Sequence, residues 1–471
     1  MKPRKKPKTF WRGLFHGLMH SPARLAVASF AGAILMGSLL LCLPISSEAR
    51  QWTGFVDGLF TSTSAICVTG LIVKDTPNYW SLFGEIVILG LIQVGGIGIM
   101  TVYAFLARML RGQLSMGFER TVGNMVDQHP QESLVGMVKF ICLFTLVAET
   151  IGAIILFISW RDAAFFAEKS SLHCIYFSIF HSISAFCNAG FSVFSDSLER
   201  FTANTGVNVA ICGLIVLGGI GFLVMRDLIE WFKWHLICRK GRKPRLTTHT
   251  KLVLTLTSLL LIVGFVGVLA MESTTSMSSA PLKERILAAM FQSVTPRTAG
   301  FNTISMDYGI LAPGSALLII VLMFIGGSPG STAGGIKTST LGVTITSTMA
   351  TLRGSDRAEM FHHSVSNETV HRVSSIILLS LSALVAGTFV LLITERGSGF
   401  SFLEIVFEST SAFGTVGLSM GITAHLSVLG KVVISGLMFI GRLGPVTVVL
   451  SAAAMQGRMA YKYPEGRIMV G

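Results

Sequence analysis

The chain has 471 residues, of which 51% are hydrophobic and 13% charged, and it carries a formal net charge of +13. A mean hydropathy of +0.68 places it among polytopic membrane proteins and excludes an ordinary soluble domain. Its seven cysteines contain no C-x-x-C pair and are odd in number, so the sequence indicates neither a disulfide framework nor a zinc site.

Eight apolar runs predict the membrane spans. All but one reach the roughly 20 residues that a helix needs to cross the hydrocarbon core. The first run follows a basic stretch, as in a signal peptide, but no small-residue cleavage site ends it, so we expect a retained helix. The runs are residues 24–43, 80–110, 134–160, 207–225, 252–271, 311–325, 374–394 and 428–454.

The basic residues fall mainly on one side of these spans. With a cytoplasmic N-terminus and eight crossings, most of the 37 Lys and Arg lie in cytoplasmic segments, whereas Arg442 lies within a span. This bias follows the positive-inside rule and predicts that both termini are cytoplasmic. Because topology and membrane lipid account for the positive charge, nucleic acid is not an expected partner.

Four short polar stretches lie between paired spans and resemble one another. Each runs from a Phe to a Gly followed by an apolar residue, and the glycines recur about every 110–120 residues, which indicates an internal repeat. The sequence therefore predicts an all-α membrane protein of four covalently linked helix–pore-loop–helix repeats in a pseudo-fourfold arrangement around one ion pore. The stretches are residues 60–71, 180–191, 291–301 and 407–418.

A second glycine cluster in the span after each polar stretch supports this register. In the first two repeats, close helix packing alone can explain these glycines. The clusters are residues 95–98, 218–221, 326–330 and 441–444. We expect a basic cytoplasmic tail, four repeats and a cytoplasmic C-terminal tail, at residues 1–23, 24–112, 113–238, 239–352, 353–457 and 458–471.

The polar stretches have the chemistry of a cation filter. Non-helical backbone survives at membrane depth only if it is buried in protein or lines a water-filled cavity. Four such segments around one axis offer inward carbonyl oxygens that can replace the hydration shell of K⁺, and glycine tolerates the positive φ values that this backbone needs. The short helices before the loops, such as residues 55–66 and 402–413, direct the negative ends of their dipoles toward the ion. The predicted ligands are the backbone carbonyls of Val68, Thr69, Gly70, Asn188, Ala189, Gly190, Thr298, Ala299, Gly300, Thr415, Val416 and Gly417.

Two features of these loops leave alternatives open. The Ser and Thr residues before each loop either tie the loop to its supporting helix or cap that helix. Arg297 lies in the third loop, where a positive charge facing the ion would repel it. We therefore expect its side chain to point behind the filter, toward a carboxylate such as Glu408 or Asp57.

The third and fourth repeats carry features of a gate. A run with five glycines and a proline interrupts the third repeat's second span, and helix resumes near Lys337. In the fourth repeat, Arg442 occupies the place of Gly96 and Gly219, where it forms either an electrostatic barrier to cations or a salt bridge, for example to Glu149. The predicted gate residues are Gly326, Gly327, Ser328, Pro329, Gly330, Ser331, Thr332, Ala333, Gly334, Gly335, Lys337 and Arg442.

With these motifs in view, the chain resembles the Ktr/Trk/HKT superfamily of potassium transporters, and within it the KtrB type of membrane subunit. The resemblance covers about residues 24–471 and rests on the four loops, the interrupted span, the motif at residues 441–445 and the tail at 463–471. Relatives of the TrkH type carry an extra pair of spans before the first repeat, which the short basic segment here does not match.

The resemblance implies K⁺ uptake across the bacterial cytoplasmic membrane, with the residue 326–337 loop and Arg442 controlling conduction. It also implies a homodimer with one pore per subunit, a cytosolic ring of KtrA-like RCK subunits that bind ATP, ADP or NAD, and stimulation by Na⁺. Plant relatives that carry Ser at the first filter glycine pass Na⁺. Here all four positions are Gly, as in the K⁺-selective pattern.

Three other functions are weighed against a K⁺ pore. A channel of the HKT type permeable to both Na⁺ and K⁺ is the nearest alternative. A secondary transporter with a midplane site also uses broken helices, but such folds usually show two inverted repeats rather than four in one orientation. A membrane enzyme is disfavoured because no HExxH, GxSxG or Walker motif occurs.

Overall fold

The computed structural model describes residues 22–98, 134–161, 171–236, 244–355 and 357–452. Within these ranges the chain is mostly helical, with non-helical loops between the helices and one small hairpin of β1 (Glu359–Met360) and β2 (His363–Ser364). Residues 1–21, 99–133 and 453–471 lie outside the described ranges. These include nearly all of the expected N-terminal tail and the whole C-terminal tail.

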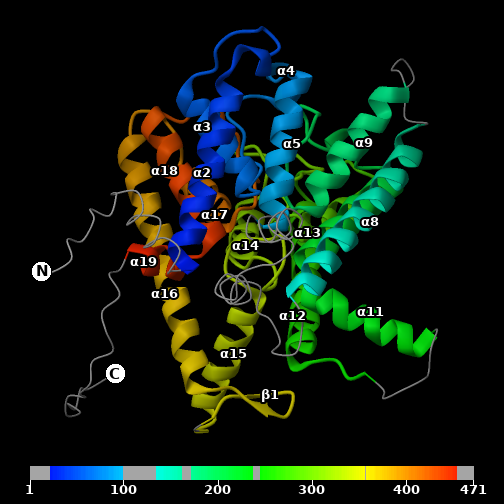
Figure 1. Cartoon of the computed structure of the whole chain (residues 1–471), viewed down its shortest axis with the longest axis vertical. Coiled ribbons are helices and arrows are strands. Elements are labelled where there is room, and N and C mark those ends of the chain that lie inside the picture. The colour runs from blue at the N-terminus through cyan, green and yellow to red at the C-terminus, as the bar shows by residue number, and fades with distance from the viewer. Residues whose placement is uncertain (1–21, 99–133, 162–170, 237–243, 356, 453–471) are drawn as a thin grey trace, which may run out of the picture.

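The predicted fold is confirmed, because each repeat contains a first span, a pore helix and a second span (Figure 1). The units are α2 (Pro22–Cys42), α3 (Phe55–Ile66) and α5 (Leu82–Ile97); α8 (Leu134–Arg161), α9 (Ser171–Phe186) and α10 (Thr205–Gly219); α12 (Thr248–Glu272), α13 (Leu282–Val294) and α14 (Pro313–Phe324); α16 (Asn367–Thr394), α17 (Phe402–Gly414) and α18 (Val428–Leu443). The connecting elements are η1 (Pro44–Ser46), α4 (Thr76–Tyr79), η3 (Glu199–Phe201), α11 (Phe222–Leu236), α15 (Thr338–Leu352), η4 (Thr423–His425) and α19 (Pro445–Ala452).

The second spans begin at local sequence signals. In three repeats a polar side chain accepts a hydrogen bond from the first turn: Ser81 from the Gly84 N–H, Asn204 from the Val207 N–H and Ser427 from the Gly430 N–H. These residues satisfy amide groups that a helix N-terminus leaves unpaired. The third repeat places a proline at the first helical position, where no amide hydrogen is needed.

The first spans α2, α8, α12 and α16 are long and apolar enough to cross a membrane. The expectation that residues 207–225 and 428–454 each form one continuous span is wrong. The chain bends by 106° between α10 and α11 and by 97° between α18 and α19. Gly221 and Gly444 lie at these bends with φ of +98° and +83°, which an L side chain rarely adopts.

In three repeats, a glycine of the first span packs against both the pore helix and the second span. In the second repeat Gly152 of α8 lies against Ser182 of α9 and Leu214 of α10, and a Cβ at Gly152 would approach the Ser182 Oγ to 2.5 Å. Gly37 and Gly264 make equivalent contacts in the first and third repeats. Ser182 also donates a hydrogen bond of 2.6 Å to the Glu149 carbonyl oxygen. Because glycine has no side chain, the spans can pack closely against the pore helices.

The first glycine of three clusters serves the close packing expected from the sequence. A Cβ at Gly95, Gly218 or Gly441 would collide with the carbonyl oxygen of the last helical residue, or the one before it, in the adjacent pore helix. Backbone oxygens cannot move aside as flexible side-chain ends can. These glycines therefore fix how closely the second spans approach the loops.

We predict that Gly95→Ala destabilises the protein by about 1–3 kcal/mol, the usual cost of overpacking. Gly90 lies on the same helix, and a Cβ added there would have no atom within 4 Å, so Gly90→Ala is the matched control and should be neutral or slightly stabilising. Thermal unfolding of the purified protein measures both. Equal melting temperatures for the two variants would contradict the packing argument.

Candidate functional site

Each pore helix ends in a loop whose backbone alternates in handedness. The first and third residues of every predicted triplet have positive φ, for example +56° at Val68 and +94° at Gly70, and +84° at Thr298 and +78° at Gly300. Alternating left-handed and right-handed residues turn successive carbonyls toward one side of a strand. Three of the four first positions carry β-branched residues, for which positive φ is costly, so surrounding contacts must hold them there.

The four loop glycines close a ring. A Cβ at Gly70 would lie 3.0 Å from the Gly190 Cα, one at Gly190 3.1 Å from the Gly300 Cα, and one at Gly300 3.1 Å from the Gly417 Cα. A Cβ at Gly417 would lie 3.0 Å from the Gly70 Cα. Each glycine thus faces the next in chain order, and the last faces the first. The four loops converge on one axis at a radius that leaves no room for a side chain.

Hydroxyl groups tie each loop to its own pore helix. Ser64 accepts from the Gly70 N–H and Ser411 from the Gly417 N–H, both at 3.1 Å. Ser184 donates to the Phe191 carbonyl at 2.8 Å, and Thr295 donates to the Phe301 carbonyl at 2.5 Å. The sequence left open whether these hydroxyl groups bond the loop to its pore helix or cap that helix. The contacts show that they bond the loop to the helix.

The shorter third loop keeps the same tie with one residue fewer. In the other repeats the amide of the middle loop residue donates to a carbonyl five residues earlier, as from Val416 to Ser411 at 2.9 Å. In the third repeat the amide of Ala299 donates to Thr295, four residues earlier, also at 2.9 Å. The deletion therefore shortens the turn and leaves the ring position unchanged.

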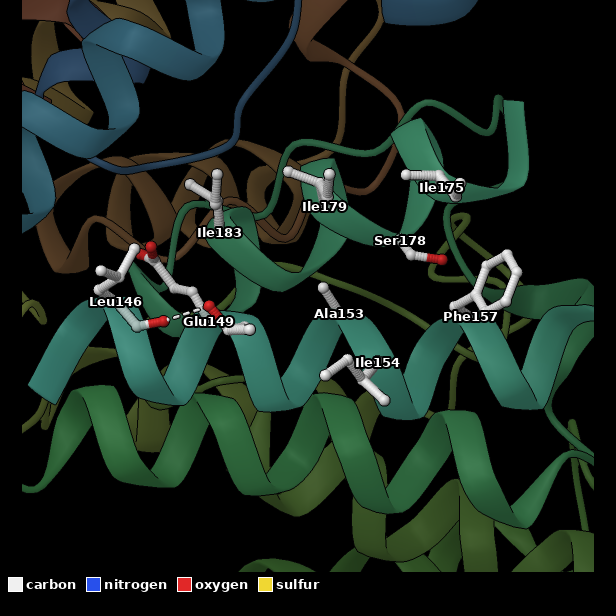
Figure 2. Close-up of a pocket in the computed structure, with 10 residues that line it drawn as sticks. Leu146, Glu149, Ala153, Ile154, Phe157, Ile175, Ser178, Ile179 and Ile183 are labelled. Atoms are coloured by element: carbon white, nitrogen blue, oxygen red, sulfur yellow. Dashed lines mark hydrogen bonds between the residues drawn. The ribbon is translucent and has the colours of Figure 1, made fainter. Parts of the chain in front are cut away.

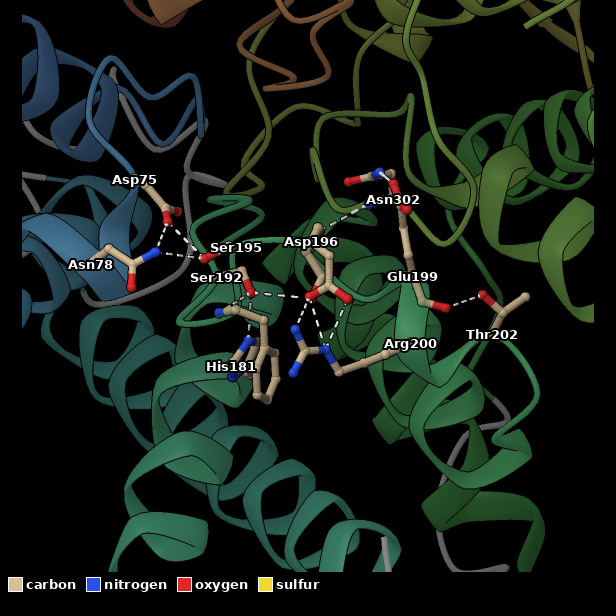
Figure 3. Close-up of polar contacts among 12 residues, drawn as sticks. Asp75, Asn78, His181, Ser192, Ser195, Asp196, Glu199, Arg200, Thr202 and Asn302 are labelled. Atoms are coloured by element: carbon tan, nitrogen blue, oxygen red, sulfur yellow. Dashed lines mark hydrogen bonds and ion pairs between the residues drawn. The ribbon is translucent and has the colours of Figure 1, made fainter. Parts of the chain in front are cut away.

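The outer ends of two loops have a second tie that the sequence analysis missed. The His181 Nε2 lies 3.0 Å from the Ser192 Oγ, and Ser419 donates to Glu408 at 2.8 Å (Figure 3 shows the His181 contact). In both repeats the polar pore-helix residue directly follows the Phe of the motif, and its partner stands two residues after the ring glycine. That shared spacing is the sequence pattern that could have predicted this second hydrogen bond.

Polar contacts also join the outer loops of neighbouring repeats (Figure 3). Ser195 donates to Asp75 at 2.7 Å, and Asn302 donates to Glu199 at 2.7 Å. Burial raises the pKa of Glu199, and the nearby carboxylates Asp196 and Asp307 raise it further. These contacts link the segments that follow the first, second and third pore loops.

The interruption between α14 and α15 forms an irregular loop that crosses to the second repeat. The amides of Ser328 and Thr332 donate to the carbonyls of Gly219 and Gly218 at 3.0 and 3.2 Å. The Thr332 hydroxyl lies 3.3 Å from the carbonyl of Phe186, the last residue of α9. The loop therefore lies against the C-terminal end of a pore helix, next to the ring loops.

Two cationic side chains bind consecutive carbonyls of this loop. Arg442 donates to the Thr332 carbonyl and to the Gly95 carbonyl, and Lys337 donates to the Ala333 carbonyl at 2.5 Å. Across the described ranges neither cation forms an ion pair. The salt bridge to Glu149 considered as one alternative is absent, because the Glu149 carboxylate accepts instead from Gln93 at 3.2 Å.

Arg297 is buried, but the prediction that it pairs with a carboxylate is wrong. Its Nη2 donates to the Gly326 carbonyl at 3.3 Å. Glu408 accepts from Ser419 and Thr423, and Asp57 pairs with Lys431 at 2.8 Å. Both candidate carboxylates therefore have other partners, and Arg297 contacts the start of the interrupted segment instead.

One apolar groove lies outside this ring. It has a volume of about 520 Å³ and lies between α8 and α9, with Glu149 at one end (Figure 2). Its other lining residues include Leu146 and Ile154, which are 63% and 53% exposed on the surface of the helices. A groove of this composition suits contact with hydrocarbon and offers an ion no series of polar ligands.

Comparison with known proteins now identifies the family. The model of the family described as TrkH, cation transport protein, matches residues 31–462. The chain belongs to the TrkH family. A solved structure of the potassium transporter TrkH from Vibrio parahaemolyticus has the same fold, with a TM-score of 0.70 at 18% identity over 93% of this chain and 88% of that one.

Curated relatives of this TrkH-family chain confirm the resemblance to the Ktr type. Ktr system potassium uptake protein B of Vibrio alginolyticus is 40% identical, over 95% of this chain and 94% of the relative. The protein of the same name in Bacillus subtilis and the potassium/sodium uptake protein NtpJ of Enterococcus hirae are each 38% identical, over 96% of this chain and 97% of theirs. The family and its apolar spans indicate a multi-pass membrane protein that transports cations.

We predict that Ser411→Ala lowers the preference for K⁺ over Na⁺ by about fivefold. The variant leaves the Gly417 amide without its acceptor, at a cost of roughly 1 kcal/mol. Ser409→Ala is the control, since among the described residues the Ser409 hydroxyl bonds only to the Ile405 carbonyl of the same helix. Competitive uptake of the two cations into proteoliposomes is the measurement. A control variant as impaired as Ser411→Ala would argue against the tie.

Proposed function

We propose that this TrkH-family chain conducts K⁺ into the cell through the ring of pore loops. The observation that carries the proposal is the closed ring of four glycines with paired positive φ values in every loop. Its relatives include potassium uptake and potassium/sodium uptake proteins, and their names support the choice of cation.

The proposed filter selects K⁺ with main-chain oxygens. Each loop contributes the carbonyls of three consecutive residues, so the ion meets stacked layers of four oxygens that take the place of its water shell. Ties such as Ser64 to Gly70 hold the strand from behind and leave the carbonyls free to face the axis. A rigid ring sized by glycine contacts discriminates between ions by how well these oxygens replace water.

The proposed gate consists of the irregular loop at residues 326–335 together with Lys337 and Arg442. A cation leaving the filter meets two positive charges close to the Thr332 and Ala333 carbonyls. Two unit charges about 4 Å apart repel by roughly 4 kcal/mol at an effective dielectric constant of 20. Conduction then requires the loop and Arg442 to separate.

The proposed regulation reaches the gate through α15. This helix begins directly after the gate loop and runs to the β1–β2 hairpin at the lower end of the molecule (Figure 1). Arg353 and Arg357 lie at that end, which the positive-inside rule assigns to the cytoplasm. A KtrA-like RCK ring that binds ATP, ADP or NAD could move α15 from below and displace the loop.

The wider assembly is proposed from the names of the relatives and the sequence resemblance. The chain acts as a homodimer in the bacterial cytoplasmic membrane, with both termini in the cytoplasm and one pore per subunit. Na⁺ serves as an activator rather than as the main transported ion. The first step in testing this is K⁺ uptake by a host lacking its own uptake systems, with and without an RCK partner, at varied Na⁺.

We predict that Gly70→Ser lowers the K⁺ over Na⁺ uptake ratio about tenfold, equal to ~1.4 kcal/mol. A Cβ at Gly70 would lie 2.5 Å from the Ala189 carbonyl oxygen and would displace it from the ring. Gly54→Ser is the control, because Gly54 caps the N-terminus of α3 with open space around it. Uptake in the deficient host is measured for both. Unchanged selectivity in Gly70→Ser would refute the filter assignment.

We predict that Arg442→Ala raises K⁺ flux about tenfold or more in the absence of activating conditions, because it removes one charge and one contact with the loop. Arg442→Lys keeps the charge and should stay nearer to the parent flux. Stopped-flow K⁺ flux from proteoliposomes provides the measurement. If Arg442→Ala folds and conducts like the parent, Arg442 has no gating role.

A further inference from the structure

Arg297 is a buried cation, and one of its N–H groups has no hydrogen-bond acceptor among the described residues. Its side chain is 7% exposed, its Nη2 reaches the Gly326 carbonyl, and its Nε has no hydrogen-bond partner among the described residues. An ionised group buried without a counter-charge is costly, because the protein interior cannot replace its hydration. A group other than the side chains in contact with Arg297 should therefore compensate its positive charge.

A small cavity lies beside this guanidinium. Its volume is about 20 Å³, just above the roughly 10–15 Å³ that one water molecule requires. Arg297 lines the cavity together with Thr257 of α12, and apolar side chains such as Val294 and Leu261 form much of the rest. The space holds one small species and excludes a polyatomic organic ion.

Thr257 also lines this cavity, and its hydroxyl group is the second polar group there without a hydrogen-bond partner among the described residues. The residue is 7% exposed, and its Oγ1 has no hydrogen-bond partner in the described structure. Buried hydroxyl groups on the helices of this protein often bond to a carbonyl one turn earlier, as Ser178 does to Cys174. Two donors from different elements therefore meet in one cavity, where the described lining side chains provide no carboxylate.

Charge distinguishes between a water molecule and an ion as the occupant. Arg297, Lys337 and Arg442 all lie in or beside the loops near the pore, and within the described ranges none of them forms an ion pair. Water would satisfy the two donors but leave the positive charge uncompensated. A monovalent anion satisfies both requirements.

We propose that this cavity binds one small monovalent anion of the chloride type, held by the Arg297 Nε–H and the Thr257 hydroxyl. Gly219 of α10 and Gly327 of the gate loop also line the cavity, so the anion sits where the third pore loop, two spans and the gate loop meet. It offsets the Arg297 charge behind the filter, which would otherwise repel cations in the ring. Binding of the anion does not depend on the assignment of the filter, and only its effect on cations in the ring rests on the proposed function.

The first test compares the melting temperature of the full-length purified protein in potassium chloride and potassium gluconate at equal K⁺. Ligand binding to the folded state raises stability, and gluconate is too large for the cavity. We expect a melting temperature several degrees higher in chloride. Thr257→Val should lose this difference while melting like the parent in gluconate, whereas Thr257→Ser should retain it.

Thr145→Val is the matched control. Thr145 also has a buried, unpartnered hydroxyl, but it does not line this cavity, so the chloride effect should persist in this variant. A crystal grown in bromide should show one anomalous peak between Arg297 and Thr257. Equal melting temperatures in chloride and gluconate, a chloride effect that survives Thr257→Val, or density without an anomalous peak would each overturn the proposal.

Discussion

The structure depends on one constraint, that backbone polar groups outside a helix must find partners at membrane depth without help from water. In the pore loops, the amide groups meet this constraint more fully than the carbonyl groups do. Most of the loop amides donate to pore-helix groups, such as the Ser64 hydroxyl and the Ser411 carbonyl, whereas no described residue donates a hydrogen bond to the carbonyls of the four loop triplets. In the proposed filter, these remaining oxygens are the ones that face the axis. Ion coordination would then be the complement of the hydrogen bonding that keeps the loops folded.

Glycine meets three separate structural demands in this fold. In the ring, Gly70 and its counterparts combine positive φ with contacts too close for a Cβ. At the start of a cluster, Gly218 lets a span touch the pore-helix carbonyl, and at its end Gly221 turns the chain through a sharp bend. Because these positions sit at matching places in the repeats, backbone geometry repeats even where side chains differ.

The sequence predicted the repeats, the loops and the interruption after residue 325, because in each case polar or glycine-rich residues break an apolar pattern. It did not predict the bends at Gly221 and Gly444, because apolar residues continue across both and hydropathy carries no information on φ. The partners of Arg297 and Arg442 were missed for another reason. Both bind main-chain carbonyls, which every residue has, so composition cannot tell which carbonyls a fold leaves free.

Selection and gating place opposite demands on the symmetry of the four repeats. A ring that replaces a hydration shell needs four equivalent loops, and the third loop keeps its place even with one residue fewer. The proposed gate needs inequality, and the repeats differ where the third has an irregular loop and the fourth has Arg442 in place of glycine. Arg442 joins that loop to the Gly95 carbonyl of the first repeat. Any movement of the loop away from the axis must break this bridge across repeats, so in the proposed gate the contact that closes the path would also set the energy required to open it.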